Sequence, residues 1–354
     1  MTVAVDLQLR RGLFRLRARF EVPASGVTAI SGPSGAGKTS LLRAIAGLER
    51  GRGLVKVGEQ VWQDAQQFIP VHQRGLGYVF QEASLFAHLD VRGNLEYGLQ
   101  RRAAQPKPEE FATTVELLGL SDLLTRSTAN LSGGERQRVA IGRALLAGPR
   151  ILLMDEPLAA LDRRHKQELL PYLETLHDEL QIPVLYVSHS PDEVARLADH
   201  LLLIDHGNVV ASGPTAEVLT RLDLPAAHEE DAAAVITGTI TRYDDDYSLC
   251  EVTFGEHTLF VPSPPRATGT TLRLRILPRD VSLTLHPQQD TSILNILPVN
   301  VTAVAAKPDS RCLIGLEVGG QQLLAQITRK SADALQLAPG KRVYAQIKTV
   351  ALLS

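Results

Sequence analysis

The sequence predicts an α/β domain with a mainly parallel sheet and a helical insertion, followed by an all-β domain of two small barrels in tandem. Three observations lead to this prediction. Short apolar runs alternate with helical patterns through residues 1–224, which is typical of parallel strands covered by helices. Strand signals become sparse between residues 82 and 147, where helical patterns dominate. Beyond residue 235 apolar and polar residues alternate, as expected for half-buried strands.

Length and composition set the broad class. With 354 residues, 44% of them hydrophobic and 21% charged, the chain is long enough for two globular domains. The 37 basic residues do not outnumber the 39 acidic ones, which argues against a nucleic-acid partner. Cys250 and Cys312 have no neighbours at metal-ligand spacing, so neither a disulfide framework nor a zinc site is expected. No signal peptide is evident at the start, and no apolar run approaches the roughly 18 residues of a membrane helix, so any link to a membrane should come through a partner.

The first domain is expected to span residues 1–224. Its buried strands are predicted at 27–30, 151–154, 184–187 and 201–204. A helix is predicted at about 38–48, and leucines recur at helical spacing from Leu169 to Leu180. The helical insertion is placed at about 82–147. The small, acidic and pattern-poor stretch at 225–234 predicts a linker.

A weak internal repeat indicates the architecture of residues 235–354. Residues 248–252 and 259–261 are similar to 311–314 and 323–325, and residues 272–276 are similar to 342–347. Two copies of about 60 residues, each made of short strands, predict two small OB-like barrels.

A phosphate-binding loop pattern, G-x-x-x-x-G-K-[ST], follows the first predicted buried strand and opens the first predicted helix. It consists of Gly32, Pro33, Ser34, Gly35, Ala36, Gly37, Lys38 and Thr39. Glycines let successive backbone N–H groups turn toward phosphate oxygens, and the helix N-terminus adds positive potential. We expect Lys38 to reach the β- and γ-phosphates and the Thr39 hydroxyl to bind Mg²⁺. A Gly-rich turn with an incidental lysine is the alternative, but the strand-loop-helix context argues against it.

A second strand ends in two carboxylates. The apolar run at 151–154 delivers Asp155 to the end of the strand, where it can hold Mg²⁺ beside the phosphate loop. Glu156 follows at once and is the candidate general base that orients the attacking water. An ordinary strand-end turn would explain this pair on its own, so the prediction depends on the phosphate loop.

A second anion-binding helix start follows Leu131. Ser132, Gly133, Gly134 and Glu135 precede a helical run over 136–146, which Ser132 can cap. A plain helix cap would explain this segment alone. In a chain that also has the phosphate loop, the segment 131–135 resembles the signature motif of the ATP-binding-cassette ATPases. The resemblance implies that Ser132, Gly133 and Gly134 of one subunit close over the ATP held by the phosphate loop of another.

The resemblance also implies roles for four further residues. Gln81 would contact Mg²⁺ and the γ-phosphate side and link the core to the helical insertion. His189 would contact the γ-phosphate, and Asp162 would lie at the seam of a dimer. Phe14 is the nearest candidate for the aromatic side chain that stacks on adenine, although a core phenylalanine on an edge strand explains it equally well.

Only one phosphate loop and one signature occur in the chain. A signature that acts on another subunit's nucleotide cannot complete a site within one chain. The resemblance therefore implies a homodimer with two ATP molecules and Mg²⁺ at a two-fold interface.

The segments between the motifs narrow the resemblance. Residues 78–86, 91–95 and 169–173 are similar to the ATPase subunits of molybdate importers, and residues 291–295 and 325–332 of the tail are similar to the small molybdate-binding barrel module. This implies a peripheral subunit on the cytoplasmic face of a bacterial inner membrane. Its partners would be two membrane-spanning permease subunits, contacted through residues 82–99, and indirectly a periplasmic solute-binding protein. An importer ATPase for sulfate, a sugar, iron or polyamine, or a non-enzymatic oxyanion-binding regulator, would be the alternatives.

The tail at about 290–354 resembles a small molybdate-binding barrel module. Leu294 stands where that module commonly has an arginine, whose guanidinium would suit an oxyanion. The candidate oxyanion ligands that remain are Ser292, Lys330 and Ser331. A tail that only dimerises is equally compatible with the sequence.

Overall fold

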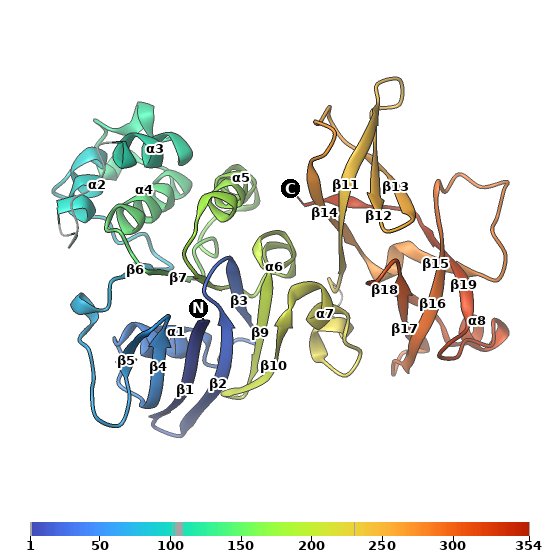
Figure 1. Ribbon diagram of the computed structural model, residues 1–354, viewed down its shortest axis with the longest axis horizontal. Coiled ribbons are helices and arrows are strands. Elements are labelled where there is room, and N and C mark those ends of the chain that lie inside the picture. The colour runs from blue at the N-terminus through green and yellow to red at the C-terminus, as the bar shows by residue number, and fades with distance from the viewer. Residues whose placement is uncertain (1, 101, 103–108, 230, 354) are drawn as a thin grey trace. The chain divides into compact units, whose positions relative to one another are not determined.

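The computed structural model describes residues 2–100, 102, 109–229 and 231–353 (Figure 1). The gaps at 101 and 103–108 fall within the predicted helical insertion, and residue 230 falls within the predicted linker. The chain divides into two compact units, residues 1–212 and 213–354. In the described part of the chain, no helix combines the length and the apolarity needed to cross a membrane.

A ten-stranded sheet forms the centre of the first unit, with the order β5-β4-β1-β2-β10-β9-β3-β8-β7-β6. Its strands are β1 (Thr2–Arg11), β2 (Phe14–Pro23), β3 (Val27–Ser31), β4 (Arg52–Val57), β5 (Gln60–Gln63), β6 (Leu76–Val79), β7 (Ile151–Asp155), β8 (Val184–Val187), β9 (His200–Asp205) and β10 (Asn208–Pro214). Strands β6, β7, β8, β3 and β9 pair in parallel. This part is the predicted parallel sheet, and continuous burial of β7 and β8 explains why their residues are apolar apart from Asp155 at the end of β7.

The other side of the sheet is antiparallel, which the sequence analysis did not predict. Strand β1 pairs antiparallel with both β2 and β4, and β4 pairs antiparallel with β5. Along β2 every second residue from Leu16 to Val22 is buried, so one face lies on the core and the other on solvent. The predicted fold class is confirmed, with a sheet that is mixed rather than parallel throughout.

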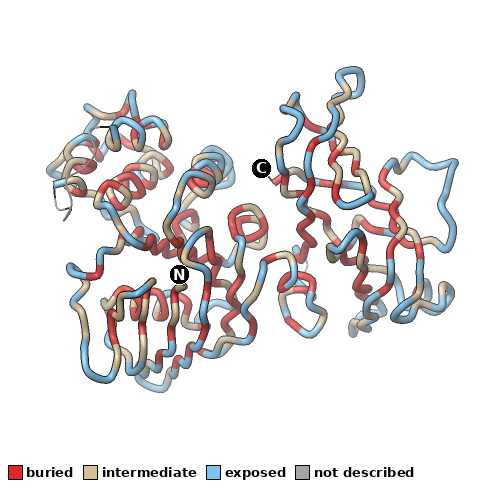
Figure 2. Tube along the Cα trace, viewed as in Figure 1, coloured by how far each residue is buried: buried red, intermediate tan, exposed pale blue. Residues whose placement is uncertain are grey.

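Helices cover this sheet and form the insertion. The first unit contains α1 (Lys38–Ala46), η1 (Val71–Gln73), α2 (Val91–Gln100), α3 (Glu110–Leu117), η2 (Ser121–Leu123), η3 (Thr128–Asn130), α4 (Gly133–Leu146), α5 (Arg163–Glu179) and α6 (Pro191–Leu197). Figure 1 shows α2, α3 and α4 grouped together, and they form the predicted helical insertion. Figure 2 shows that burial is concentrated along the central strands and the inner faces of the helices.

The second unit begins before the predicted linker. Residues 213–224, which the sequence analysis assigns to the first domain, cluster with residues 225–354. The reason is that α7 (Thr215–Thr220) buries Val218 and Leu219 and packs against strands of the second unit. Residues 225–234 contain the short helix η4 (Pro225–His228) and the first residue of β11.

Two five-stranded antiparallel sheets make up the rest of the second unit, with the orders β13-β12-β11-β14-β20 and β15-β19-β16-β17-β18. Their elements are β11 (Ala234–Asp244), β12 (Leu249–Phe254), β13 (His257–Pro262), β14 (Thr271–Ile276), η5 (Pro278–Asp280), β15 (Val281–Thr284), β16 (Asn295–Ala306), β17 (Arg311–Val318), β18 (Gln321–Thr328), α8 (Arg329–Ala334), β19 (Arg342–Ile347) and β20 (Ala351–Leu352). The four strands β11–β14 and the four strands β16–β19 have the same order, which explains the internal repeat. The long first strand of each repeat carries an irregularity, at Ile240/Arg242 in β11 and at Val301/Ala303 in β16.

The two sheets exchange their fifth strands. Strand β15 follows β14 in the chain but pairs with β19 of the other sheet, whereas β20 follows β19 and pairs with β14. One hydrophobic core includes residues of both sheets, such as Cys250, Leu274, Cys312 and Ala345. The two predicted barrels are therefore interlocked halves of one unit.

Candidate nucleotide site

The carboxyl ends of three parallel strands bring the predicted site residues to one edge of the sheet. Ile30 near the end of β3 pairs with Val187 at the end of β8, and Val187 pairs with Asp155 at the end of β7. The phosphate loop begins two residues after Ile30, Glu156 follows Asp155, and His189 lies two residues after Val187. Ligands of open α/β sheets bind at this edge.

The phosphate loop has a backbone that glycine alone allows at two positions. Gly32 has φ of 146°, and a Cβ on it would lie 2.0 Å from the carbonyl oxygen of Ile204. Gly37 has φ of 103°, and a Cβ there would lie 2.6 Å from Cζ of Phe14. Gly37 also precedes the first residue of α1, so the N-terminus of this helix faces the loop. The loop can therefore approach an anion closely with its backbone N–H groups.

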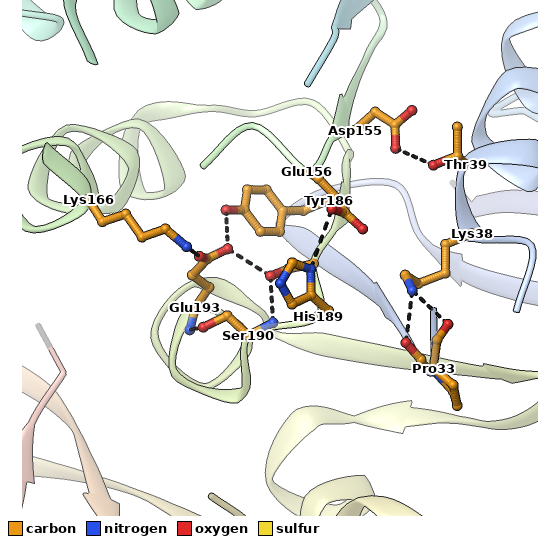
Figure 3. A network of polar contacts seen from close by, with 12 residues as sticks. Pro33, Lys38, Thr39, Asp155, Glu156, Lys166, Tyr186, His189, Ser190 and Glu193 are labelled. Carbon is orange, nitrogen blue, oxygen red and sulfur yellow. Dashed lines mark hydrogen bonds and ion pairs between the residues drawn. The ribbon is translucent and has the colours of Figure 1, made fainter. Parts of the chain in front are cut away.

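Lys38 is held inside the loop. Its Nζ donates to the carbonyl oxygens of Gly32 at 2.8 Å and Pro33 at 3.0 Å (Figure 3). Burial lowers the pKa of Lys38, while the charges of Glu156 and Asp155 act in the opposite direction. Among the described residues the acceptors of this ammonium are neutral carbonyls, which leaves its charge available for a phosphate oxygen.

A cavity of about 570 Å³ opens over this loop. It is lined by Arg11, Phe14, Ser34, Gly35, Gly37, Lys38, Thr39, Ser40, Gln81 and Glu156. The structure thus brings the predicted residues Phe14, Gln81 and Glu156 together with the phosphate loop. The volume of this cavity lies in the range found for small-molecule binding sites.

Asp155 is the best-supported candidate for a metal ligand. The Thr39 hydroxyl donates to its Oδ1 at 2.8 Å, and the Tyr78 hydroxyl donates to its Oδ2 at 3.0 Å (Figure 3 shows the first of these bonds). Burial raises the pKa of Asp155, the charge of Glu156 adds to this, and the two hydrogen bonds oppose it. A hydroxyl and a carboxylate at hydrogen-bond distance fit Mg²⁺, which takes few protein ligands and hard oxygen donors.

Tyr78 is a residue that the sequence analysis missed. Burial, with the charge of Asp155, raises its pKa, so the phenol stays protonated and donates. Its position three residues before Gln81, on the strand beside β7, was the signal available in the sequence.

Glu156 and His189 lie together. Glu156 Oε2 is 3.4 Å from His189 Nδ1, and the Glu156 side chain is 21% exposed (Figure 3). Glu156 has φ of +46°, a backbone conformation that costs a residue other than glycine about 1 kcal/mol or more. With this backbone conformation, Glu156 lines the cavity over the phosphate loop.

The signature segment lies at a different cavity. Ser132 caps α4 by accepting from the Glu135 amide at 3.2 Å, and Glu135 Oε2 accepts from the Ser132 amide at 2.6 Å. Ser132 and Gly134 line a cavity of about 300 Å³ that shares no lining residue with the cavity over the phosphate loop. Asp162 caps α5 and is exposed. Ser132, Gly134 and Asp162 are thus not brought to the phosphate loop within one chain, whereas Gly133 lines a groove with Gln81.

The predicted oxyanion ligands of the tail lie at the surface. Ser292 lies in the segment before β16, whereas Lys330 and Ser331 lie in the first turn of α8. All three are exposed, and the Ser331 hydroxyl bonds the Thr328 hydroxyl at 2.8 Å. Among the described residues no hydrogen bond joins Ser292 to the other two.

A phosphate loop, a carboxylate pair at the end of the neighbouring strand and a capped helix outside the loop cavity are the features of the ATP-binding-cassette ATPases, and they define the class of this chain. Residues 17–159 match the ABC transporter family, and residues 291–353 match the TOBE domain.

Curated relatives give the particular family. The chain is 53% identical over 360 aligned residues to the molybdenum import ATP-binding protein ModC of Pseudomonas fluorescens, with 100% of both chains covered. It is 54% identical over 342 residues to the ModC of Thiobacillus denitrificans, which covers 96% of this chain and 94% of the relative. The chain belongs to the family of the molybdenum import ATP-binding proteins.

Solved structures agree with the fold of the first unit. A nucleotide-free ATP-binding cassette from an ABC transporter has a TM-score of 0.54 and 25% identity, over 65% of this chain and 97% of that one. CbiO1 of Clostridium perfringens, part of an ABC transporter complex, has a TM-score of 0.54 and 24% identity, over 62% of this chain and 90% of that one.

Proposed function

We propose that this chain hydrolyses ATP as the energy-supplying subunit of a molybdate importer. The observation that carries the proposal is that Lys38, Thr39, Gln81 and Glu156 all line one cavity. The names of the curated relatives support molybdate as the solute. Tungstate has the same charge and tetrahedral shape and would be carried as well.

Different residues of the cavity would bind the phosphates and the metal during hydrolysis. ATP with Mg²⁺ supplies the transferable phosphoryl group and a metal charge that neutralises it. The loop from Gly32 to Gly37 would hold the phosphates with backbone N–H groups, and Lys38 would place its ammonium on the outer phosphate oxygens. Thr39, Asp155 and Gln81 would hold the metal.

Glu156 and His189 would act on the attacking water and the outer phosphate. Glu156 Oε2 would orient the water and take its proton, and His189 would donate to a phosphate oxygen. Phe14 packs against Gly37 and lines the cavity, which supports its role beneath adenine.

Two copies of the chain would complete the site. The separate cavity at Ser132 and Gly134 supports an arrangement in which each copy supplies its signature to the nucleotide of the other. The exposed carboxylate of Asp162 would lie at the seam between them.

The membrane-spanning partner would dock beside Gln81. A groove of about 310 Å³ is lined by Gln81, Glu82, Ala83, Ser84, Leu85, Gly133, Arg136, Gln137, Pro157, Ala160 and Leu161. Leu85, Phe86 and Leu89 are each partly exposed in the adjoining segment. This placement suits two permease subunits that receive the movement of the helical insertion, with the chain on the cytoplasmic face of the inner membrane and a periplasmic solute-binding protein beyond them.

Transport assays test the function. In vesicles that contain the chain and its permease, we expect molybdate uptake to require ATP and Mg²⁺ and to resist excess sulfate. Uptake that sulfate abolishes would favour the alternative importer class. Absence of Mg²⁺-dependent hydrolysis would remove the proposal altogether.

The tail is proposed to sense molybdate through Ser292, Lys330 and Ser331. We expect molybdate to lower the ATPase activity of the assembled transporter through a coupling free energy of about 1–3 kcal/mol. Lys330→Ala should weaken this inhibition, whereas the basal activity should persist. No inhibition at saturating molybdate would leave the tail as a dimerisation element.

A further inference from the structure

The carboxylate of Glu193 is buried at the centre of a polar network beside His189. Its side chain is 6% exposed. Glu193 Oε2 accepts from the Tyr186 hydroxyl at 2.9 Å and from the Ser188 hydroxyl at 2.7 Å, and Oε1 accepts from Lys166 Nζ at 3.1 Å (Figure 3). These partners come from β8, the segment after it and α5, so one side chain of α6 joins three parts of the chain.

The network fixes the backbone on both sides of His189. The Ser190 amide donates to the Ser188 hydroxyl at 3.0 Å, and the Glu193 amide donates to the Ser190 hydroxyl at 3.4 Å. His189 therefore lies between two serines that are both tied to Glu193. Its own imidazole is 58% exposed, and its Nδ1 lies 3.4 Å from Glu156 Oε2. The backbone, more than any packing of the ring, sets where the imidazole points.

Lys166 connects this network to the segment around Asp162. The Lys166 amide donates to the Asp162 carbonyl at 3.0 Å in the first turn of α5, and Asp162 is the N-cap of that helix. A shift of the Asp162 segment would thus carry Lys166 with it. The only ion pair that Lys166 makes among the described residues is with Glu193.

We propose that the Lys166–Glu193 ion pair is a positioning element for hydrolysis, which sets the placement of His189 and ties it to the position of the Asp162 segment. A buried ion pair costs desolvation and is a weak source of stability, whereas it fixes geometry well. The inference rests on the role proposed above for His189 and adds two residues, Lys166 and Glu193, that do not line the cavity over the phosphate loop.

The chain offers a matched control. Glu174 of α5 and Arg196 of α6 form a second ion pair between the same two helices, with an Nε–Oε1 distance of 2.6 Å. Both side chains are largely buried, at 18% and 21% exposed. This pair joins α5 to α6 as the Lys166–Glu193 pair does, but the Ser188 hydroxyl donates to Glu193 and not to Glu174.

The test compares Lys166→Met with Arg196→Met in the full chain. We expect Lys166→Met to lower kcat by about 10- to 100-fold, the usual cost of a misplaced reacting group, with ATP affinity changed less than about twofold. Lys166→Arg should restore most of the activity. Arg196→Met should keep kcat even if it lowers the unfolding midpoint. Equal kcat for the Lys166→Met and wild-type proteins would overturn the inference.

A double-mutant cycle shows whether the pair acts through His189. In a His189→Ala background, we expect Lys166→Met to cause no further loss of kcat, because the group that it positions is gone. A further loss as large as in the wild-type background would overturn the inference while leaving the role of His189 intact. Full activity of His189→Ala would instead overturn the proposed role of His189, and with it this inference.

A second variant guards against misfolding, since Lys166→Met leaves a buried carboxylate without its cation. The double variant Lys166→Met, Glu193→Gln removes both charges and keeps an oxygen acceptor for Tyr186 and Ser188. We expect it to fold with a thermal midpoint close to that of the wild type and to show the same fall in kcat. Wild-type kcat in this variant would overturn the inference.

Discussion

Replacing Glu156 with glutamine tests the chemical assignment most directly. The change removes the base but keeps the length of the side chain, and the backbone at φ of +46° is no worse for glutamine than for glutamate. General-base catalysis contributes about 10²- to 10⁴-fold, which is about 3–5 kcal/mol of transition-state stabilisation. The Glu156 carboxylate is largely shielded from solvent, so bulk water is a poor substitute for it. We therefore expect kcat to fall by that factor.

ATP binding should survive the same change. Glu156 lines the cavity that would receive the phosphates, so loss of its negative charge should leave ATP affinity unchanged or higher. Phosphate release measures turnover, and equilibrium binding of ATP with Mg²⁺ measures affinity. Glu59→Gln is the control, because Glu59 is 84% exposed and pairs only loosely with Lys56, at 3.7 Å. Turnover of Glu156→Gln within about threefold of the wild type, well short of the loss expected for a general base, would remove Glu156 from its role.

Three further predictions concern binding and stability. Lys38→Ala should lower ATP affinity by about 10- to 100-fold, because charge-assisted hydrogen bonds are lost, and calorimetry that finds unchanged affinity would contradict the loop assignment. Thr39→Val should keep ATP binding in the absence of Mg²⁺ but lose its enhancement by Mg²⁺; a titration with the metal that matches wild type would remove Thr39 from the metal site. Asn295→Ala should destabilise the second unit by about 2 kcal/mol in urea, because the Asn295 amide bonds both the N–H and the C=O of Phe260, at 2.7 and 3.0 Å. An unshifted urea midpoint would show that this clamp between the sheets contributes little.

The parallel half of the sheet could be predicted because its information is local. The buried strand 151–154 is uniformly apolar, and three buried strands, 27–30, 151–154 and 184–187, are followed by candidate site residues. The antiparallel half of the sheet also has a pattern in the sequence that predicts strands. The alternation of buried and exposed residues in β2 is visible in the sequence from Leu16 to Val22, yet it has no helix beside it to mark it as part of the same sheet.

The polar network at Glu193 could not be predicted from spacing. Lys166 lies 27 residues before Glu193 and on another helix, so only the packing of α5 against α6 brings the two together. The grouping of residues 213–224 with the second unit could not be predicted for a similar reason, since α7 looks like one more helix of the α/β pattern until its contacts are seen. The assignments of Phe14 to adenine and of Ser292, Lys330 and Ser331 to an oxyanion stay predictions.

The exchange of β15 and β20 has a consequence for how the protein is made. The first of the two β-sheets lacks its edge strand until residues 351 and 352 arrive, and Leu353 adds a hydrogen bond to Arg273 at 3.0 Å. The first sheet therefore cannot be completed until the chain has been synthesised through β20, after all strands of the second sheet. Strand pairs so far apart in the chain also form slowly. Deletion of residues 351–353 would thus damage the sheet that was synthesised first.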